Sequence, residues 1–111
     1  MTVADLIREL GLEVFCAGGG LDAVVEGGYT SDLLSDVMGH ADSGRVWITL
    51  QAHKNVVAIA SLKDLAAVII VKGFKPDPET LELASREGVV LLGSAEQEFE
   101  LSGKIYALLN S

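Results

Sequence analysis

The chain has 111 residues, of which 50% are hydrophobic and 22% are charged, a composition typical of one globular domain. Sixteen acidic residues against eight basic ones give a net charge of −8, which argues against binding to nucleic acid polymers and to anionic membrane surfaces. The single cysteine, Cys16, excludes an internal disulfide bond, and no cluster of histidine and cysteine residues predicts a metal site or another cofactor.

The N-terminus is predicted to form a helix over residues 2–10. Its apolar residues follow the i, i+3, i+4, i+7 spacing of an amphipathic helix, Thr2 is placed to cap it and Gly11 to end it. A strand is expected over residues 12–17. The glycines at 18–20 then predict a hairpin or a flexible loop, because no Lys-Ser/Thr pair follows them as in a phosphate-binding loop. There is no signal-peptide layout, so a cytoplasmic location is expected.

The next segment is predicted to be a strand over residues 21–26 and a short helix over residues 33–38, which Thr30 or Ser31 would cap and Gly39 would end. Gly27 and Gly28 would then leave the strand just before a hydroxyl-rich helix start. Such a turn brings backbone N–H groups to one point, which suits a bound anion. Equally, the two glycines could supply only a turn and Thr30 only a helix cap.

A third strand is predicted over residues 46–50, where a nearly continuous apolar run indicates a strand covered on both faces. A polar corner at residues 51–55 follows, and Asn55 can cap the segment 56–65. By periodicity that segment could be a strand, but its alanines and the need for a crossover between parallel strands favour a helix. Because the segment is apolar on nearly all sides, we expect burial on two sides, for example by a second copy in a homodimer.

The C-terminal part continues the alternation of strands and helices. A strand is predicted over residues 67–71, followed by a turn. Asp77 then caps a helix with Pro78 at its first position, and Gly88 ends that helix. A strand over residues 89–92 and a final helix over residues 95–109 complete the chain.

Strands that alternate with helices from residue 21 onward predict an α/β fold with a mostly parallel sheet and helices on both faces. In such folds, ligands bind beyond the carboxyl ends of the strands. The turns expected at that edge bring together lysines, an imidazole, hydroxyls and glycines, which favour a phosphate, a carboxylate or a nucleotide as ligand. The candidate ligand-binding residues are Gly27, Gly28, Thr30, Ser31, His53, Lys54, Asn55, Lys72, Gly73 and Lys75.

A catalytic site is not predicted. His53 could act as an acid or base, but no nucleophile or carboxylate is tied to it by a recognisable motif. Asp32 and Asp36 are spaced i, i+4 on one expected helix face, which is a weak signal for an acid pair or a metal and is more typical of solvated surface. We therefore expect that the chain is not an enzyme.

Three stretches resemble a DRTGG domain: GGYTSDLLSDVMGHA, then VWITLQAHKNVVAIASLKDLAAVIIVKGFKPDPETLELASREGVVLL, then FELSGKIYALL. DRTGG domains occur beside CBS domains in some inorganic pyrophosphatases and as small standalone proteins, and they are similar to the N-terminal domain of HPr kinase/phosphorylase. His53-Lys54-Asn55 stands where Asp-Arg-Thr would follow the third strand, and Lys72-Gly73 stands where a glycine pair would follow the next. This departure keeps a cation and a helix cap and loses the acidic residue and one glycine.

The resemblance implies an α/β fold, a regulatory or ligand-sensing role and frequent self-association. The leading hypothesis is thus a non-catalytic regulatory domain, dimeric, that binds an anionic small molecule or nucleotide at the carboxyl edge of the sheet. The alternative is a protein-interaction adaptor whose protein partner covers the apolar helix 56–65, with no small-molecule ligand.

Overall fold

A mixed sheet of five strands forms the centre of the structure, and the computed structural model describes all 111 residues. The strands are β1 (Glu13–Cys16), β2 (Gly27–Thr30), β3 (Arg45–Thr49), β4 (Ala67–Ile70) and β5 (Leu91–Gly93), in the spatial order β1-β5-β4-β3-β2. β2 to β5 run parallel to their neighbours, whereas β1 runs antiparallel to β5, with Glu13 opposite Gly93.

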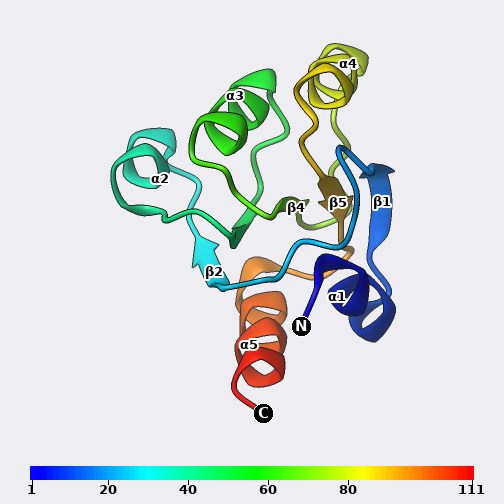
Figure 1. Cartoon of the computed structure of the whole chain (residues 1–111), viewed down its shortest axis with the longest axis vertical. Coiled ribbons are helices and arrows are strands. Elements are labelled where there is room, and N and C mark those ends of the chain that lie inside the picture. The colour runs from blue at the N-terminus through cyan, green and yellow to red at the C-terminus, as the bar shows by residue number, and fades with distance from the viewer.

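Helices cover both faces of this sheet (Figure 1). α1 (Val3–Leu10) and α5 (Glu98–Leu109) lie on one face, and α2 (Leu34–His40), α3 (Lys54–Leu62) and α4 (Pro78–Glu87) lie on the other. Side chains alternate between the two resulting cores: Val46 and Ile48 of β3 pack with α1 and α5, whereas Trp47 between them packs with the other three helices. The predicted α/β fold with a mostly parallel sheet is therefore confirmed.

Local capping chemistry sets the ends of α1 and α4 as the sequence predicts. The Thr2 hydroxyl accepts a hydrogen bond from the Asp5 N–H at 3.2 Å, and the Asp5 carboxylate accepts one from the Thr2 N–H at 2.9 Å. In α4, Asp77 Oδ1 accepts from the Thr80 N–H at 2.8 Å. Both helices end at a glycine in the left-handed region, Gly11 (φ +62°) and Gly88 (φ +70°), which residues with a Cβ rarely adopt.

The second strand differs from the prediction. Residues 21–26 form no strand beyond an isolated bridge between Val24 and Thr2. Their backbone instead pairs with the start of the chain: Val25 N–H donates to the Met1 carbonyl, and the carbonyls of Ala23 and Leu21 accept from the first residues of α1. Because those groups are already used, pairing with β3 begins only at residue 27, so Gly27 and Gly28 lie inside β2 and not in a turn after it.

Three helix starts also lie elsewhere than predicted. Neither Thr30 nor Ser31 is the N-cap of α2, which begins after Leu33 and continues past Gly39 to His40. The N-cap of α3 is His53 and not Asn55, because Nδ1 of His53 accepts a hydrogen bond from the Asn55 N–H. α5 begins at Glu98 and not at residue 95. β5 begins two residues later and ends one residue later than predicted.

α3 confirms the choice of helix over strand for this segment. Val56, Val57, Ile59 and Ala60 are buried, and α2 and α4 flank the helix on either side. Three side chains of α3, Ala58, Ser61 and Leu62, are exposed together with its first two residues. The rest of the same chain therefore covers most of the apolar surface of α3. No helix in the structure combines the length and the apolar character needed to cross a lipid bilayer.

Candidate functional site

The carboxyl ends of β2 and β3 are tied together by Asp32. Its Oδ1 accepts hydrogen bonds from the Thr49 hydroxyl at 2.8 Å and from the Leu50 N–H at 2.7 Å. The Gln51 side-chain amide donates to the Asp32 carbonyl at 3.1 Å. Thr49 is fully buried, and its hydroxyl also accepts from the Gln51 N–H. The polar groups that end these two strands thus satisfy one another.

A pair of carboxyl groups lies at this edge. Glu98, at the start of α5, is half-buried and hydrogen-bonds Asp32, and Lys72 is the nearby cation. Desolvation, the hydrogen bond to Asp32 and the negative charge of Asp32 together raise the pKa of Glu98 to about 6, against the opposing effect of Lys72. Desolvation alone would raise the pKa of Asp32 as well, but the donors of Leu50 and Thr49 outweigh it and the pKa is lowered. Glu98 is therefore the member of the pair that takes up a proton first as the pH falls.

Lys72 and Gly73 form the turn after β4. Both have a left-handed backbone (φ +61° and +72°), and the Phe74 N–H donates to the Val71 carbonyl, as in a type I′ turn. The N–H groups of Lys72 and Gly73 donate to the carbonyls of Glu96 and Ser94 in the loop after β5, each at 2.9 Å. These N–H groups are therefore occupied by the chain itself.

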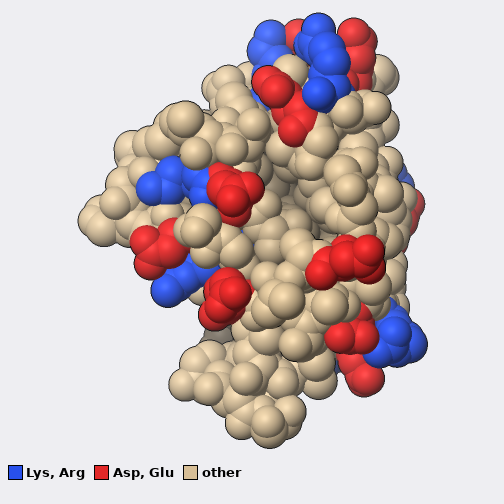
Figure 2. Space-filling model, viewed as in Figure 1, with Lys and Arg blue, Asp and Glu red and all other residues tan.

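The predicted lysines do not gather into one cluster. Lys54 Nζ lies 2.8 Å from Glu79 of α4. Lys75 Nζ lies 3.1 Å from Glu13 of β1 and 5.3 Å from the centre of the Phe15 ring. Lys72 lies beside the Asp32–Glu98 pair. The ammonium groups of Lys54 and Lys75 thus pair with carboxylates on two different elements. Figure 2 shows acidic and basic side chains intermixed over α4.

His53 and Asn55 stand at the start of α3, next to the start of α4. The Thr80 hydroxyl, buried in α4, donates to the Ala52 carbonyl at 3.1 Å and joins the two helix starts. Donors at the Thr80 backbone and side chain lower the pKa of Asp77, and the nearby His53 acts in the same direction. Nδ1 of His53 accepts a hydrogen bond from the backbone of its own helix.

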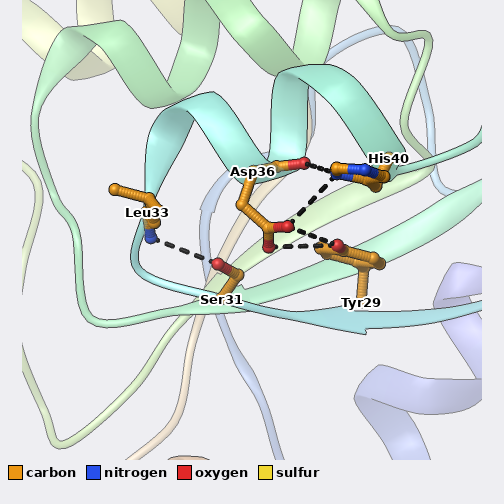
Figure 3. A network of polar contacts seen from close by, with 5 residues as sticks. All are labelled: Tyr29, Ser31, Leu33, Asp36 and His40. Carbon is orange, nitrogen blue, oxygen red and sulfur yellow. Dashed lines mark hydrogen bonds and ion pairs between the residues drawn. The ribbon is translucent and has the colours of Figure 1, made fainter.

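Asp36 lies apart from Asp32 and belongs to a second network, on α2 (Figure 3). The Tyr29 hydroxyl donates to both carboxylate oxygens of Asp36 at 3.0 Å, and His40 Nδ1 lies 3.3 Å from Oδ1. The hydroxyls of Ser31 and Tyr29 hold the pKa of Asp36 below its usual value. The weak acid-pair signal of Asp32 and Asp36 is therefore wrong: Asp32 precedes α2 and points to β3, whereas Asp36 points to Tyr29.

A cleft of about 380 Å³ lies between edge strand β2 and helix α5, and we call it the β2–α5 cleft. Three of the predicted residues line it, Gly27, Gly28 and Thr30. The other lining residues that carry polar or aromatic groups include Arg45, Ser102 and Tyr106. The Thr30 and Ser102 hydroxyls lie 2.8 Å apart and join β2 to α5. A Cβ at Gly28 would lie 3.8 Å from Val46 and 4.0 Å from Ile105, so a side chain there would rest on the core in van der Waals contact.

Sequence reasoning missed the contributions of Arg45 and α5 to this cleft. Arg45 is half-buried, with Nη2 3.3 Å from Asp42, and the Tyr106 side chain is 73% exposed. The signal for α5 was its apolar residues on more than one helix face, of which the sheet can cover only one. Nothing in the sequence marks Arg45, because its place depends on the position of β2.

The sequence matches no family model and no curated protein. The fold is similar to the crystal structure of the CBS and DRTGG domains of the regulatory region of Clostridium perfringens pyrophosphatase complexed with an activator, diadenosine tetraphosphate, with a TM-score of 0.73 and 14% sequence identity. The match covers 94% of this chain and 45% of that chain, so this chain spans less than half of its length. At such an identity the likeness shows the fold alone, and the fold it supports is DRTGG-like.

Proposed function

We propose that this chain is a non-catalytic regulatory domain that senses a small molecule in the β2–α5 cleft. The observation that carries this proposal is the composition of the cleft: one guanidinium group from Arg45, two hydroxyls and an exposed phenol ring beside backbone that carries no side chain at Gly27 and Gly28. Its volume of about 380 Å³ falls within the range of small-molecule sites, about 300–1,000 Å³.

The chemistry of the cleft favours a ligand with one aromatic ring and one anionic group. Tyr106 offers a face on which a ring can stack, and Arg45 offers a planar donor for a phosphate or a carboxylate. Glu26 also lines the cleft, and the chain carries a net charge of −8, so a ligand with many negative charges is disfavoured. A nucleoside monophosphate meets these requirements.

The similarity in fold gives independent support for a regulatory role. The structure with which this chain shares its fold comes from the regulatory region of a pyrophosphatase and holds a nucleotide activator.

Thermal unfolding in the presence of nucleoside monophosphates tests this proposal. A ligand at one hundred times its dissociation constant should stabilise the chain by about 2.7 kcal/mol. Arg45→Gln, which removes the cation, and Gly28→Val, which fills the cleft from a strand position that tolerates valine, should abolish the stabilisation. The matched control is Lys72→Gln at the carboxyl edge, which should bind as the wild type does.

Two results would contradict the proposal. If no nucleoside monophosphate stabilises the chain, the proposed class of ligand is wrong. Stabilisation that Lys72→Gln abolishes and Arg45→Gln leaves intact would place the ligand at the carboxyl edge of the sheet, with His53, Lys54 and Gly73, and not in the cleft.

A further inference from the structure

We propose that the Asp32–Glu98 pair is a proton-controlled contact that holds the start of α5 against the sheet and thereby sets the ligand affinity of the β2–α5 cleft. The contact forms when the pair takes up one proton and weakens when both carboxyl groups are ionised. The inference adds regulation to the proposed function and rests on that function for its ligand, but its effect on α5 is measurable without a ligand.

α5 supplies one wall of the β2–α5 cleft. Ser102, Ile105, Tyr106 and Leu109 of this helix line the cleft, and β2 supplies the opposite wall. α5 packs on β2 and β3 of the sheet. A movement of α5 relative to β2 therefore changes the width of the cleft and the position of the ring on which a ligand would stack.

The first turn of α5 is joined to the sheet by the Asp32–Glu98 pair. Glu98 is the first residue of α5 and hydrogen-bonds Asp32, which lies just after the end of β2. The N-cap residue of α5, Gln97, makes no capping hydrogen bond with its side chain. The first buried side chain of the helix, Leu101, lies three residues further along. Loss of the contact would thus free the first turn before it reaches the core.

The charges around Glu98 leave the pair short of positive charge. Asp32, from the loop after β2, and Lys72, from the turn after β4, are the charged groups that act on Glu98. On α5 itself, Lys104 pairs at 2.6 Å with Glu96 of the preceding loop. One ammonium group therefore faces two carboxyl groups, and an added proton balances the remaining negative charge.

The pair holds one proton over a defined pH range. Against desolvation, the donors of Leu50 and Thr49 keep the pKa of Asp32 below its ordinary value of 3.8. Desolvation, the hydrogen bond to Asp32 and its charge raise the pKa of Glu98 to about 6. From pH 3.8 to about 6, Glu98 thus carries the proton and donates it to Asp32. The contact is lost as the pH rises through 6, because two ionised carboxyl groups repel each other.

The shift in pKa limits the size of the effect. Desolvation of Glu98 and its contact with Asp32 raise the pKa from 4.5 to about 6, so they can change a coupled equilibrium by at most about thirtyfold. Desolvation supplies part of this shift, and the positive end of the α5 dipole favours ionised Glu98. We therefore expect nucleotide affinity to fall by about threefold to tenfold between about pH 5 and about pH 7.5.

Hydrogen exchange without ligand, at about pH 5 and about pH 7.5, tests the contact. In the wild type, protection factors of the amides of residues 101–105 should fall by about threefold or more as the pH rises. Glu98→Gln should keep its protection, because the glutamine amide donates to Asp32 at both pH values. The matched control is Glu100→Gln, at an exposed glutamate in the same turn, which should lose protection as the wild type does.

Titration with adenosine, guanosine, cytidine and uridine monophosphates at the same pH values tests the effect on the cleft. From low to high pH, the dissociation constant of the wild type should rise by about threefold to tenfold more than that of Glu98→Gln. Ionisation of the nucleotide phosphate affects both proteins equally and cancels in this comparison.

Two further variants test the roles of the neighbouring charges. Asp32→Asn places a side-chain amide donor opposite ionised Glu98, so its affinity should not fall as the pH rises. Lys72→Gln removes the cation that favours ionised Glu98. It should bind nucleotides as the wild type does at about pH 5 and move the midpoint of the change to higher pH.

The inference is overturned if protection of α5 depends on pH equally in the wild type and in Glu98→Gln, or if Glu100→Gln removes that dependence. It is also overturned if nucleotide affinity depends on pH equally in the wild type and in Glu98→Gln. If none of the nucleotides binds at either pH, the proposed function fails, and hydrogen exchange then decides by itself whether the pair holds α5. The two failures are thus distinguishable.

Discussion

The carboxyl edge of the sheet and the outer side of α5 differ in how far the chain satisfies its own side chains. At the carboxyl edge, Asp32 accepts two hydrogen bonds from the neighbouring strand end, and the lysines there face carboxylates. On α5, two aromatic rings and a helical glycine have no partner within the chain. The difference teaches that polar groups at the usual position of a ligand site in a parallel sheet can be paired with groups of the same chain.

The largest loss of stability should come from removing the Asp32 carboxylate, which ties together the carboxyl ends of β2 and β3. Asp32→Ala leaves the buried Thr49 hydroxyl without its acceptor and should lower the free energy of unfolding by about 1–2 kcal/mol, as measured by urea denaturation. Asp42→Ala, which removes an exposed carboxylate near Arg45, is the matched control and should change it by less than about 0.5 kcal/mol. Equal stability of Asp32→Ala and the wild type would show that this edge is not tied together.

The substitution Glu98→Gln should change how the stability of the chain depends on pH. The pKa of Glu98 is about 6 in the folded chain, against an ordinary value of 4.5, so the folded state binds the proton more tightly than the unfolded state does. Its contribution to stability is therefore greatest below pH 4.5 and is lost as the pH rises through 6. Glu98→Gln should remove this loss and be more stable than the wild type at pH 7, by on the order of 1 kcal/mol because water screens the half-exposed carboxyl.

Unfolding curves at several pH values measure the effect of Glu98→Gln. Glu82→Gln on α4 is the control and should follow the wild-type pH dependence. A stability curve for Glu98→Gln that falls between pH 4.5 and 6 as steeply as the wild type would contradict the assignment of the proton to Glu98.

A substitution in the β2–α5 cleft should lower the stability much less than Asp32→Ala does. Thr30→Val removes an exposed hydrogen bond to Ser102 and replaces a strand residue by one of equal shape and good strand propensity. The free energy of unfolding should change by less than about 0.5 kcal/mol in chemical denaturation. A loss as large as that of Asp32→Ala would mean that the Thr30–Ser102 contact holds α5 on the sheet.

The smallest effect is expected at the surface ion pair of Lys54. Hydrogen bonding to Glu79 and the charge of Glu79 raise the pKa of Lys54, yet both side chains are largely exposed to water. Lys54→Met should leave the melting temperature unchanged in calorimetry, because the exposed pair is screened. A clear loss of stability would indicate that this pair joins α3 to α4 more strongly than the buried Thr80 hydroxyl does.

The sequence was sufficient for the features that depend on neighbouring residues. The caps at Thr2 and Asp77 and the left-handed ends at Gly11 and Gly88 are local chemistry, and all four are present. The position of β2 could not be predicted in this way. Residues 21–26 have the better strand composition, but their backbone groups pair with the start of α1, and the glycine-rich segment 27–30 forms the strand in their place.

The candidate site was harder to predict, because it depends on residues that are distant in sequence. The pairing of Lys75 with Glu13 and of Lys54 with Glu79 could not be read from the spacing of the lysines. The position of Gly28 above Ile105 required the correct strand as well as the docking of α5. From the sequence alone, only the types of residue at the site could be predicted. These are glycines and hydroxyl-bearing residues close to a group that binds an anion.

The pairing of β1 with β5 has a consequence for synthesis of the chain. Glu13 lies opposite Gly93, so the first strand has no partner until nearly all of the chain has left the ribosome. α1 can form early because its caps are local, whereas β1 must wait with its backbone unpaired. We therefore expect that ribosome-bound chains lacking β5 are cut by proteases between α1 and β2 and that this segment becomes protected last.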